Sequence, residues 1–89
     1  MLTNVKTAQA ACGTDSAGSS TFSSATVVRL VNTTATARVV TVVDEVGGST
    51  TIGSFTMLGN SVEFVEKKST EAIYAADASV LGAKVGYTN

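Results

Sequence analysis

Two runs of β-branched residues near the middle of the chain show the strongest pattern of hydrophobic and polar positions. They span residues 26–32 (TVVRLVN) and 37–44 (ARVVTVVD), and the polar residues 33–36 separate them. Valine and threonine favour strands, and two such runs joined by a short polar connection are typical of a β-hairpin. The pattern therefore predicts an antiparallel hairpin over residues 26–44.

Both faces of this predicted hairpin are apolar. Successive side chains of a strand point to opposite faces, so a strand with one wet face should alternate apolar and polar residues. No amphipathic helix pattern is present that could cover a second apolar face. We therefore expect one face to pack in the subunit's own core and the other against another protein chain; the alternative is a face of good strand formers that is simply left exposed. The expected contact residues are Val27, Arg29, Val31, Val39, Thr41 and Val43, together with Phe22, and an exchange of the core and contact faces is a further alternative.

Turn signals divide the rest of the chain into further short strands. Gly47-Gly48 and Gly59-Asn60 are dipeptides typical of tight turns. The expected strands are residues 50–58, 61–67, 71–75 and 80–88, with an edge strand or a short helix in residues 1–11. Gly53 predicts a bulge or a close backbone approach within its strand. The strand over residues 80–88 has one apolar face and one glycine-rich face, and the second is flat enough for another group to lie against it.

Residues 12–25 (CGTDSAGSSTFSSA) are rich in glycine and serine, and Phe22 is their only large apolar residue. A segment of this composition has too little apolar surface to offset the entropy lost when it becomes ordered. It is therefore predicted to be a flexible loop or arm, anchored by Phe22, that becomes ordered on a partner chain.

These patterns predict a single all-β domain over residues 1–89. Short strands with turns about every eight to twelve residues are typical of a small antiparallel β-sandwich or a partly open barrel, here of about six to seven strands with a flexible Ser/Gly-rich N-terminal loop. The chain has no proline to block its strand edges. We expect those edges either to be short and curled or to be used in assembly.

No set of residues forms a recognisable catalytic or metal site. The chain has no histidine and one cysteine, Cys12, which removes the usual general base and any multi-thiolate metal site. Glu63 and Glu66 are three residues apart on one strand and so face opposite sides. Asp44-Glu45 and Asp77 could offer oxygen ligands to calcium, but the spacing of a calcium-binding loop is missing. We expect a protein that is not an enzyme and has no catalytic residues, cofactor or bound metal.

The net charge of −1 gives the protein no electrostatic field to attract nucleic acid or an anionic membrane. No apolar run approaches the ~18 residues of a membrane span, and residues 1–11 lack the pattern of a secretion signal. We therefore expect a protein made in the cytoplasm that has neither a nucleic-acid nor a membrane partner.

Three features of residues 27–89 are shared with a known family. They are the strand VRLVN, a later strand that ends in lysine before a polar S-T-E connection, and the terminal motif A-x-V-x-Y-T-N. In these features the chain resembles small β-sandwich structural proteins of tailed marine bacteriophages, such as those that infect cyanobacteria. The resemblance implies a virion component, either a capsid decoration (cement) protein or a neck or tail accessory protein. Its implied partners are the major capsid protein or other virion proteins and further copies of itself, and it implies no catalytic residue.

Two other functions are compatible with the residues. A carbohydrate-binding β-sandwich would stack a sugar on Tyr74 or Tyr87 at an exposed face. A host-encoded homo-oligomer, such as a filament or ring subunit, would assemble without a viral shell.

Overall fold

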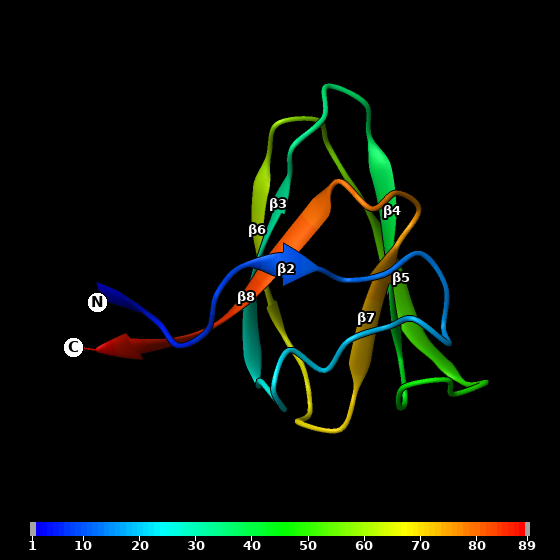
Figure 1. Ribbon diagram of the computed structural model, residues 1–89, viewed down its shortest axis with the longest axis horizontal. Coiled ribbons are helices and arrows are strands. Elements are labelled where there is room, and N and C mark those ends of the chain that lie inside the picture. Colours follow the sequence, from blue (N-terminus) through cyan, green and yellow to red (C-terminus); the bar gives the residue numbers. More distant parts are fainter. Residues whose placement is uncertain (1, 89) are drawn as a thin grey trace.

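The computed structural model describes residues 2–88, together with all side chains in that range except those of Tyr87 and Thr88. Every regular element in this range is a strand (Figure 1). The strands are β1 (Leu2–Val5), β2 (Ala10–Ala11), β3 (Val27–Asn32), β4 (Arg38–Val43), β5 (Thr51–Met57), β6 (Val62–Glu66), β7 (Ala72–Ala75) and β8 (Val80–Thr88). The predicted all-β class is confirmed, with eight strands instead of six to seven.

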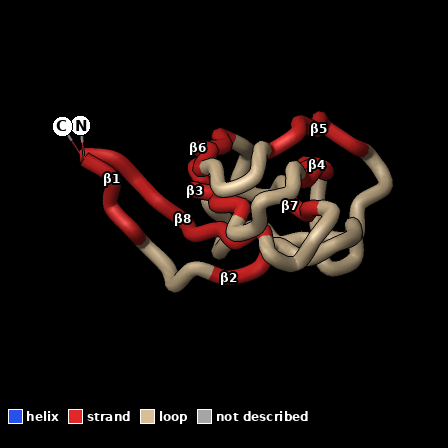
Figure 2. The backbone as a smooth tube through the Cα atoms, turned by 90° about the horizontal axis from the view of Figure 1, so that it is seen from above, coloured by secondary structure: helices blue, strands red, loops and turns tan. Residues whose placement is uncertain are grey.

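Two antiparallel sheets pack face to face, as Figure 2 shows from above. The five-stranded sheet has the order β1-β8-β3-β6, with β2 also paired to β8, and the three-stranded sheet has the order β5-β4-β7. The core lies between the sheets, where Leu30 of β3, Val40 of β4 and Ile73 of β7 are fully buried. The protein is thus a small β-sandwich with one face of each sheet turned outward.

The predicted hairpin over residues 26–44 is wrong. Its two runs do form strands, β3 and β4, but β3 pairs with β6 and β8, whereas β4 pairs with β5 and β7. The connection between β3 and β4 therefore crosses from one sheet to the other. Local composition cannot separate a hairpin from such a crossover, because both need two strands and a polar connection.

Asn32 explains why the chain crosses at this point. Its side chain is fully buried at the end of β3, and its amide nitrogen lies 2.8 Å from the carbonyl oxygen of Thr36 and 3.3 Å from those of Met57 and Leu58. Its side-chain oxygen accepts hydrogen bonds from the backbone N–H and the hydroxyl of Thr34. A buried amide needs such partners, and two of them, the carbonyls of Met57 and Leu58, lie at the end of β5 in the other sheet.

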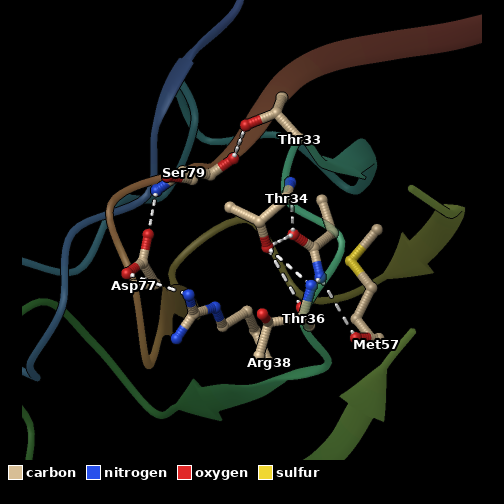
Figure 3. A network of polar contacts seen from close by, with 8 residues as sticks. Thr33, Thr34, Thr36, Arg38, Met57, Asp77 and Ser79 are labelled. Carbon is tan, nitrogen blue, oxygen red and sulfur yellow. Dashed lines mark hydrogen bonds and ion pairs between the residues drawn. The ribbon is translucent and has the colours of Figure 1, made fainter. Parts of the chain in front are cut away.

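A second group of polar contacts closes the same end of the sandwich (Figure 3). The hydroxyl of Thr33 donates to the carbonyl of Ser79 at 2.7 Å, and the N–H of Ser79 donates to the carboxylate of Asp77 at 2.8 Å. The guanidinium of Arg38 lies 3.5 Å from the same carboxylate. Hydrogen bonds from Ser79 lower the pKa of Asp77, and the charge of Arg38 has a smaller effect in the same direction.

The strands β4 and β5 are the one consecutive pair that forms a hairpin within residues 2–88. Gly47, in the predicted glycine turn, has a φ of +73°, a value that glycine adopts without strain. The register of the pair shifts between Val42 and Val43, which lie opposite Gly53 and Thr51. The bulge predicted at Gly53 is therefore confirmed beside it, and Ile52 is the additional residue.

Residues 12–25 pack against the sandwich and do not extend as a free arm. Cys12 and Phe22 belong to the core. Ser20 forms an antiparallel bridge with Ile73, in which the N–H of each residue donates to the carbonyl of the other at 2.9–3.0 Å. The segment is therefore a loop, and its predicted anchoring by Phe22 is confirmed. Its order within the subunit is not apparent from its few apolar side chains, because it depends in part on backbone hydrogen bonds to the edge of β7.

Phe22 lies over the glycine-rich face of β8, where the sequence predicts that another group can lie. A Cβ atom added at Gly82 would come within 2.7–2.8 Å of the Phe22 ring, so the ring can lie this close only to glycine. Phe22, Ser23 and Ser24 have φ values of 53°, 57° and 58°, in the left-handed region that is costly for residues other than glycine. Three consecutive strained residues thus place the ring in the core.

Candidate protein-contact surface

The structure divides the predicted contact residues between the two outer faces of the sandwich. Val27, Arg29 and Val31 alternate with the buried residues of β3 and point away from the core. Val39 and Thr41 are on the outward side of β4, in the other sheet. The predicted residues therefore do not form one continuous surface, and they share a face only within each strand.

Three of the predicted contact residues are covered by the subunit itself. Phe22, Thr41 and Val43 are 6%, 9% and 2% exposed. Phe22 is part of the core, and Val43 lies opposite the buried Ala72 of β7. Their assignment as contact residues is corrected, because side chains buried in the subunit cannot line a surface for another chain.

The outward side of the five-stranded sheet is apolar, and we call it the valine face. It consists of Val27, Val31, Val62, Phe64 and Leu81. Val62 and Phe64 on β6 are 41% and 47% exposed, and the other three side chains are half-buried. Arg29 lies opposite Phe64 on this face, and Glu66 lies opposite Val27. A contiguous group of exposed apolar side chains of this kind is typical of a protein interaction site.

Sequence reasoning missed Val62, Phe64 and Leu81 as surface residues. The alternation in β6 and β8 shows two distinct faces but does not say which one is inside. The inward side of β6 carries Glu63 and Val65, which lie opposite Leu30 and Val28 of β3. Val65 packs against the core, and the next inward position is the buried Lys67. The available signal was Val65, an apolar residue on the side that otherwise carries charges.

A two-stranded ribbon extends the five-stranded sheet beyond the body of the sandwich (Figures 1 and 2). It is formed by β1 and the end of β8, paired from Leu2 with Thr88 to Val5 with Val85. Leu2 and Val5 are 73% and 67% exposed. Because two isolated strands are only marginally stable in water, a partner that covered this ribbon would stabilise it.

Lys67 and Cys12 are buried groups whose contacts indicate a structural function. The Lys67 ammonium donates to the carbonyl of Ala25 at 2.6 Å and to that of Lys68 at 3.3 Å. Burial lowers the pKa of Lys67, although the charge of Glu71 opposes this shift. Burial raises the pKa of the Cys12 thiol to about 11, so the thiolate that nucleophilic chemistry requires does not form at neutral pH.

Residues 2–88 contain no group of three or more metal-ligating His, Cys, Asp or Glu side chains and no pocket. The same part of the chain has no helix that is long and apolar enough to cross a membrane. Tyr74 lies opposite Thr41 on the outward side of the three-stranded sheet and is half-buried. The side chain of Tyr87, the other predicted sugar-stacking residue, lies outside the described part of the structure.

The fold and its surface define an all-β antiparallel sandwich with an exposed apolar face. No protein-family model matches the chain, and no match is found among curated proteins or solved structures.

Proposed function

We propose that this chain is a non-enzymatic virion structural protein, a capsid decoration (cement) protein that binds the phage shell through its valine face. The observation that carries the proposal is the exposure of Val62 and Phe64 beside three further apolar side chains of the same face. The resemblance of residues 27–89 to phage structural proteins supports a virion as the assembly in question.

The physical basis of decoration is preferential binding to the assembled shell. A protein that binds across neighbouring shell subunits stabilises the lattice relative to its separate parts. Each apolar contact contributes roughly 25 cal/mol per Å² of buried surface, and many copies on a symmetric lattice hold together even when each single contact is weak. Leu2 and Val5 face opposite sides of the ribbon because they are three residues apart on one strand. Val5 pairs with Val85, on the same side of β8 as Leu81, and this exposed valine would provide a second contact on the same sheet.

The partners of this protein are then the major capsid protein or other virion proteins, and it is located in the virion. The net charge of −1 favours protein contacts over contacts with packaged nucleic acid. A neck or tail accessory protein would use the same valine face, and a carbohydrate-binding module would instead use Tyr74 on the opposite side.

The test compares Val62→Lys with Val39→Lys. Both valines are exposed, at 41% and 46%, and they lie on opposite outer faces of the sandwich, so the two variants form a matched pair. Purified protein is mixed with phage shells assembled without it, and co-sedimentation is measured. Val62→Lys should abolish binding, since a charge buried in an apolar contact is costly, and Val39→Lys should bind as the wild type does.

The outcomes separate the alternatives. Co-sedimentation with isolated necks or tails in place of shells would indicate an accessory protein. Retention on cell-surface polysaccharide that is lost in Tyr74→Ala would indicate a carbohydrate-binding module. A wild-type protein that binds no virion particle at all contradicts the proposal.

A further inference from the structure

The strand β5 is an open edge of the three-stranded sheet, and its backbone directions follow from the neighbouring strands. The N–H of Ala76 donates to the carbonyl of Val39 at 2.9 Å, so the backbone groups of Val39 point toward β7. Thr56 lies opposite Val39 on the other side of β4. In an antiparallel ladder the bonded and non-bonded pairs alternate, so the N–H and C=O groups of Thr56, and of Ser54 two residues earlier, point away from β4 to the open edge.

The composition of β5 leaves this edge unprotected. Open edges are usually guarded by charged residues, proline or shortness, yet Thr51–Met57 is seven residues long and has neither charge nor proline. The strand β6, at the corresponding edge of the other sheet, carries Glu63 and Glu66. The outer edge of β7 is already paired with Ser20 of the N-terminal segment. The remaining edge strands, β1 and β2, have four and two residues.

We propose that β5 pairs antiparallel with β5 of a second copy of this chain across a two-fold axis at Phe55. Each Ser54 then lies opposite the Thr56 of the other copy, and these two pairs exchange four backbone hydrogen bonds. The two three-stranded sheets become one six-stranded sheet. This register uses Gly53 to Met57, the regular part of the strand, and leaves the bulge at Ile52 outside the interface.

A second copy fits this edge better than an unrelated strand for two reasons. The edge is uncharged, so two identical copies meet without the like-charge repulsion that the glutamates of β6 would cause in the same arrangement. A two-fold contact also uses the same edge on both molecules and so ends in a closed dimer. Phe55, which is half-buried and packs against the core, would then lie beside its symmetry mate and close the open side of both cores. The dimer forms without a shell, so it does not depend on the proposed decoration function.

The test measures native mass by analytical ultracentrifugation from about 1 µM to about 1 mM, together with amide exchange. Wild-type protein should reach twice the monomer mass of 9.0 kDa, with slow exchange at Ser54 and Thr56. Thr56→Pro removes an outward N–H without breaking the β4 ladder and should give a monomer. Thr56→Ala keeps that N–H and should stay dimeric.

A second variant keeps the test valid if the proline variant misfolds. The double substitution Ser54→Lys with Thr56→Lys adds two lysines to each copy, so four positive charges would meet near the two-fold axis of the dimer. Both positions lie outside the monomer core. The double variant should therefore be monomeric and show rapid exchange at both amides. A wild type that stays monomeric over the whole range overturns the proposal. So does a dimer that survives the lysine substitutions or leaves the amides of Ser54 and Thr56 in rapid exchange.

Discussion

The side-chain amide of Asn32 donates to the backbone carbonyl of Met57 at 3.3 Å and thereby connects the two sheets across one end of the core. Asn32 lies at the end of β3 in the five-stranded sheet, and Met57 lies at the end of β5 in the three-stranded sheet. The same nitrogen lies 2.8 Å from the carbonyl of Thr36, in the connection that leads to β4. One buried side chain thus joins the end of β3 both to its own connection and to the end of β5, which is 25 residues away in the sequence.

Replacing Asn32 with alanine should lower the free energy of unfolding by about 2–4 kcal/mol, because it leaves buried carbonyl groups without a donor and creates a cavity. Urea unfolding followed by circular dichroism measures the change. The control is Asn4→Ala in the ribbon, where loss of less than about 0.5 kcal/mol is expected at a partly exposed site. Equal losses in the two variants would show that the Asn32 amide does not hold the sheets together.

Gly82 should be intolerant of even one added methyl group. A Cβ atom there would lie 2.7–2.8 Å from the Phe22 ring and 2.9 Å from a Leu30 methyl, so Gly82→Ala should cost about 1–3 kcal/mol of stability. Gly53 has no atom within 4 Å of the corresponding position, and Gly53→Ala should cost nothing. Chemical denaturation of both variants provides the comparison.

A double-mutant cycle identifies the cause of the Gly82 effect. Phe22→Leu removes the rigid ring, so Gly82→Ala should cost less in that background than in the wild type, with a coupling of about 0.5–3 kcal/mol. If the two effects simply add, the strain at Gly82 does not come from Phe22.

The positions of the strands could be predicted from the sequence because β-branched residues and glycine turns are local signals. The run at residues 80–88 matches β8 residue for residue, and the run at residues 61–67 contains β6. Pairing could not be predicted in the same way. Alternation shows that a strand has two faces, but it does not identify the partners of β3, which are β6 and β8, both distant in the sequence.

The candidate surface was predictable only in part, for a related reason. The sequence predicts a contact face at Val27 and Val31, and both side chains point outward. Whether they bind another chain stays a prediction. Val62 and Phe64 were missed because the apolar side of a one-sided strand is normally its inner side. In β6 that expectation is reversed, since Val65 and Lys67 take the inward positions.

The left-handed residues after Thr21 offer a way to stabilise the protein. Ser23 has a φ of 57° and is exposed, and its contact with the Lys84 ammonium is made by the backbone carbonyl at 3.1 Å. Ser23→Gly therefore removes strain and keeps the hydrogen bond, and it should raise stability by about 1 kcal/mol, or roughly 4–8 °C in Tm. Ser49→Gly, at an exposed position without positive φ, should lower it by a few tenths of a kcal/mol. A lower Tm for Ser23→Gly would show that this turn is unstrained.

Stability should change at alkaline pH through Cys12. Burial raises the pKa of its thiol from 9.0 to about 11, so between these values the unfolded chain has released a proton that the folded chain still holds. The contribution of Cys12 to the free energy of unfolding is fully present below pH 9. It falls by roughly 2 kcal/mol as the pH rises toward 11. Lys67 acts in the opposite direction, because its pKa is lowered from 10.5 and the folded chain loses that proton first. The measurement is the difference in unfolding free energy between the wild type and Cys12→Ala at several pH values. This difference should shrink from pH 9 to 11. It should shrink equally in a Lys67→Met background. A difference that is constant with pH would mean that the thiol ionises as easily in the folded protein as in the unfolded chain.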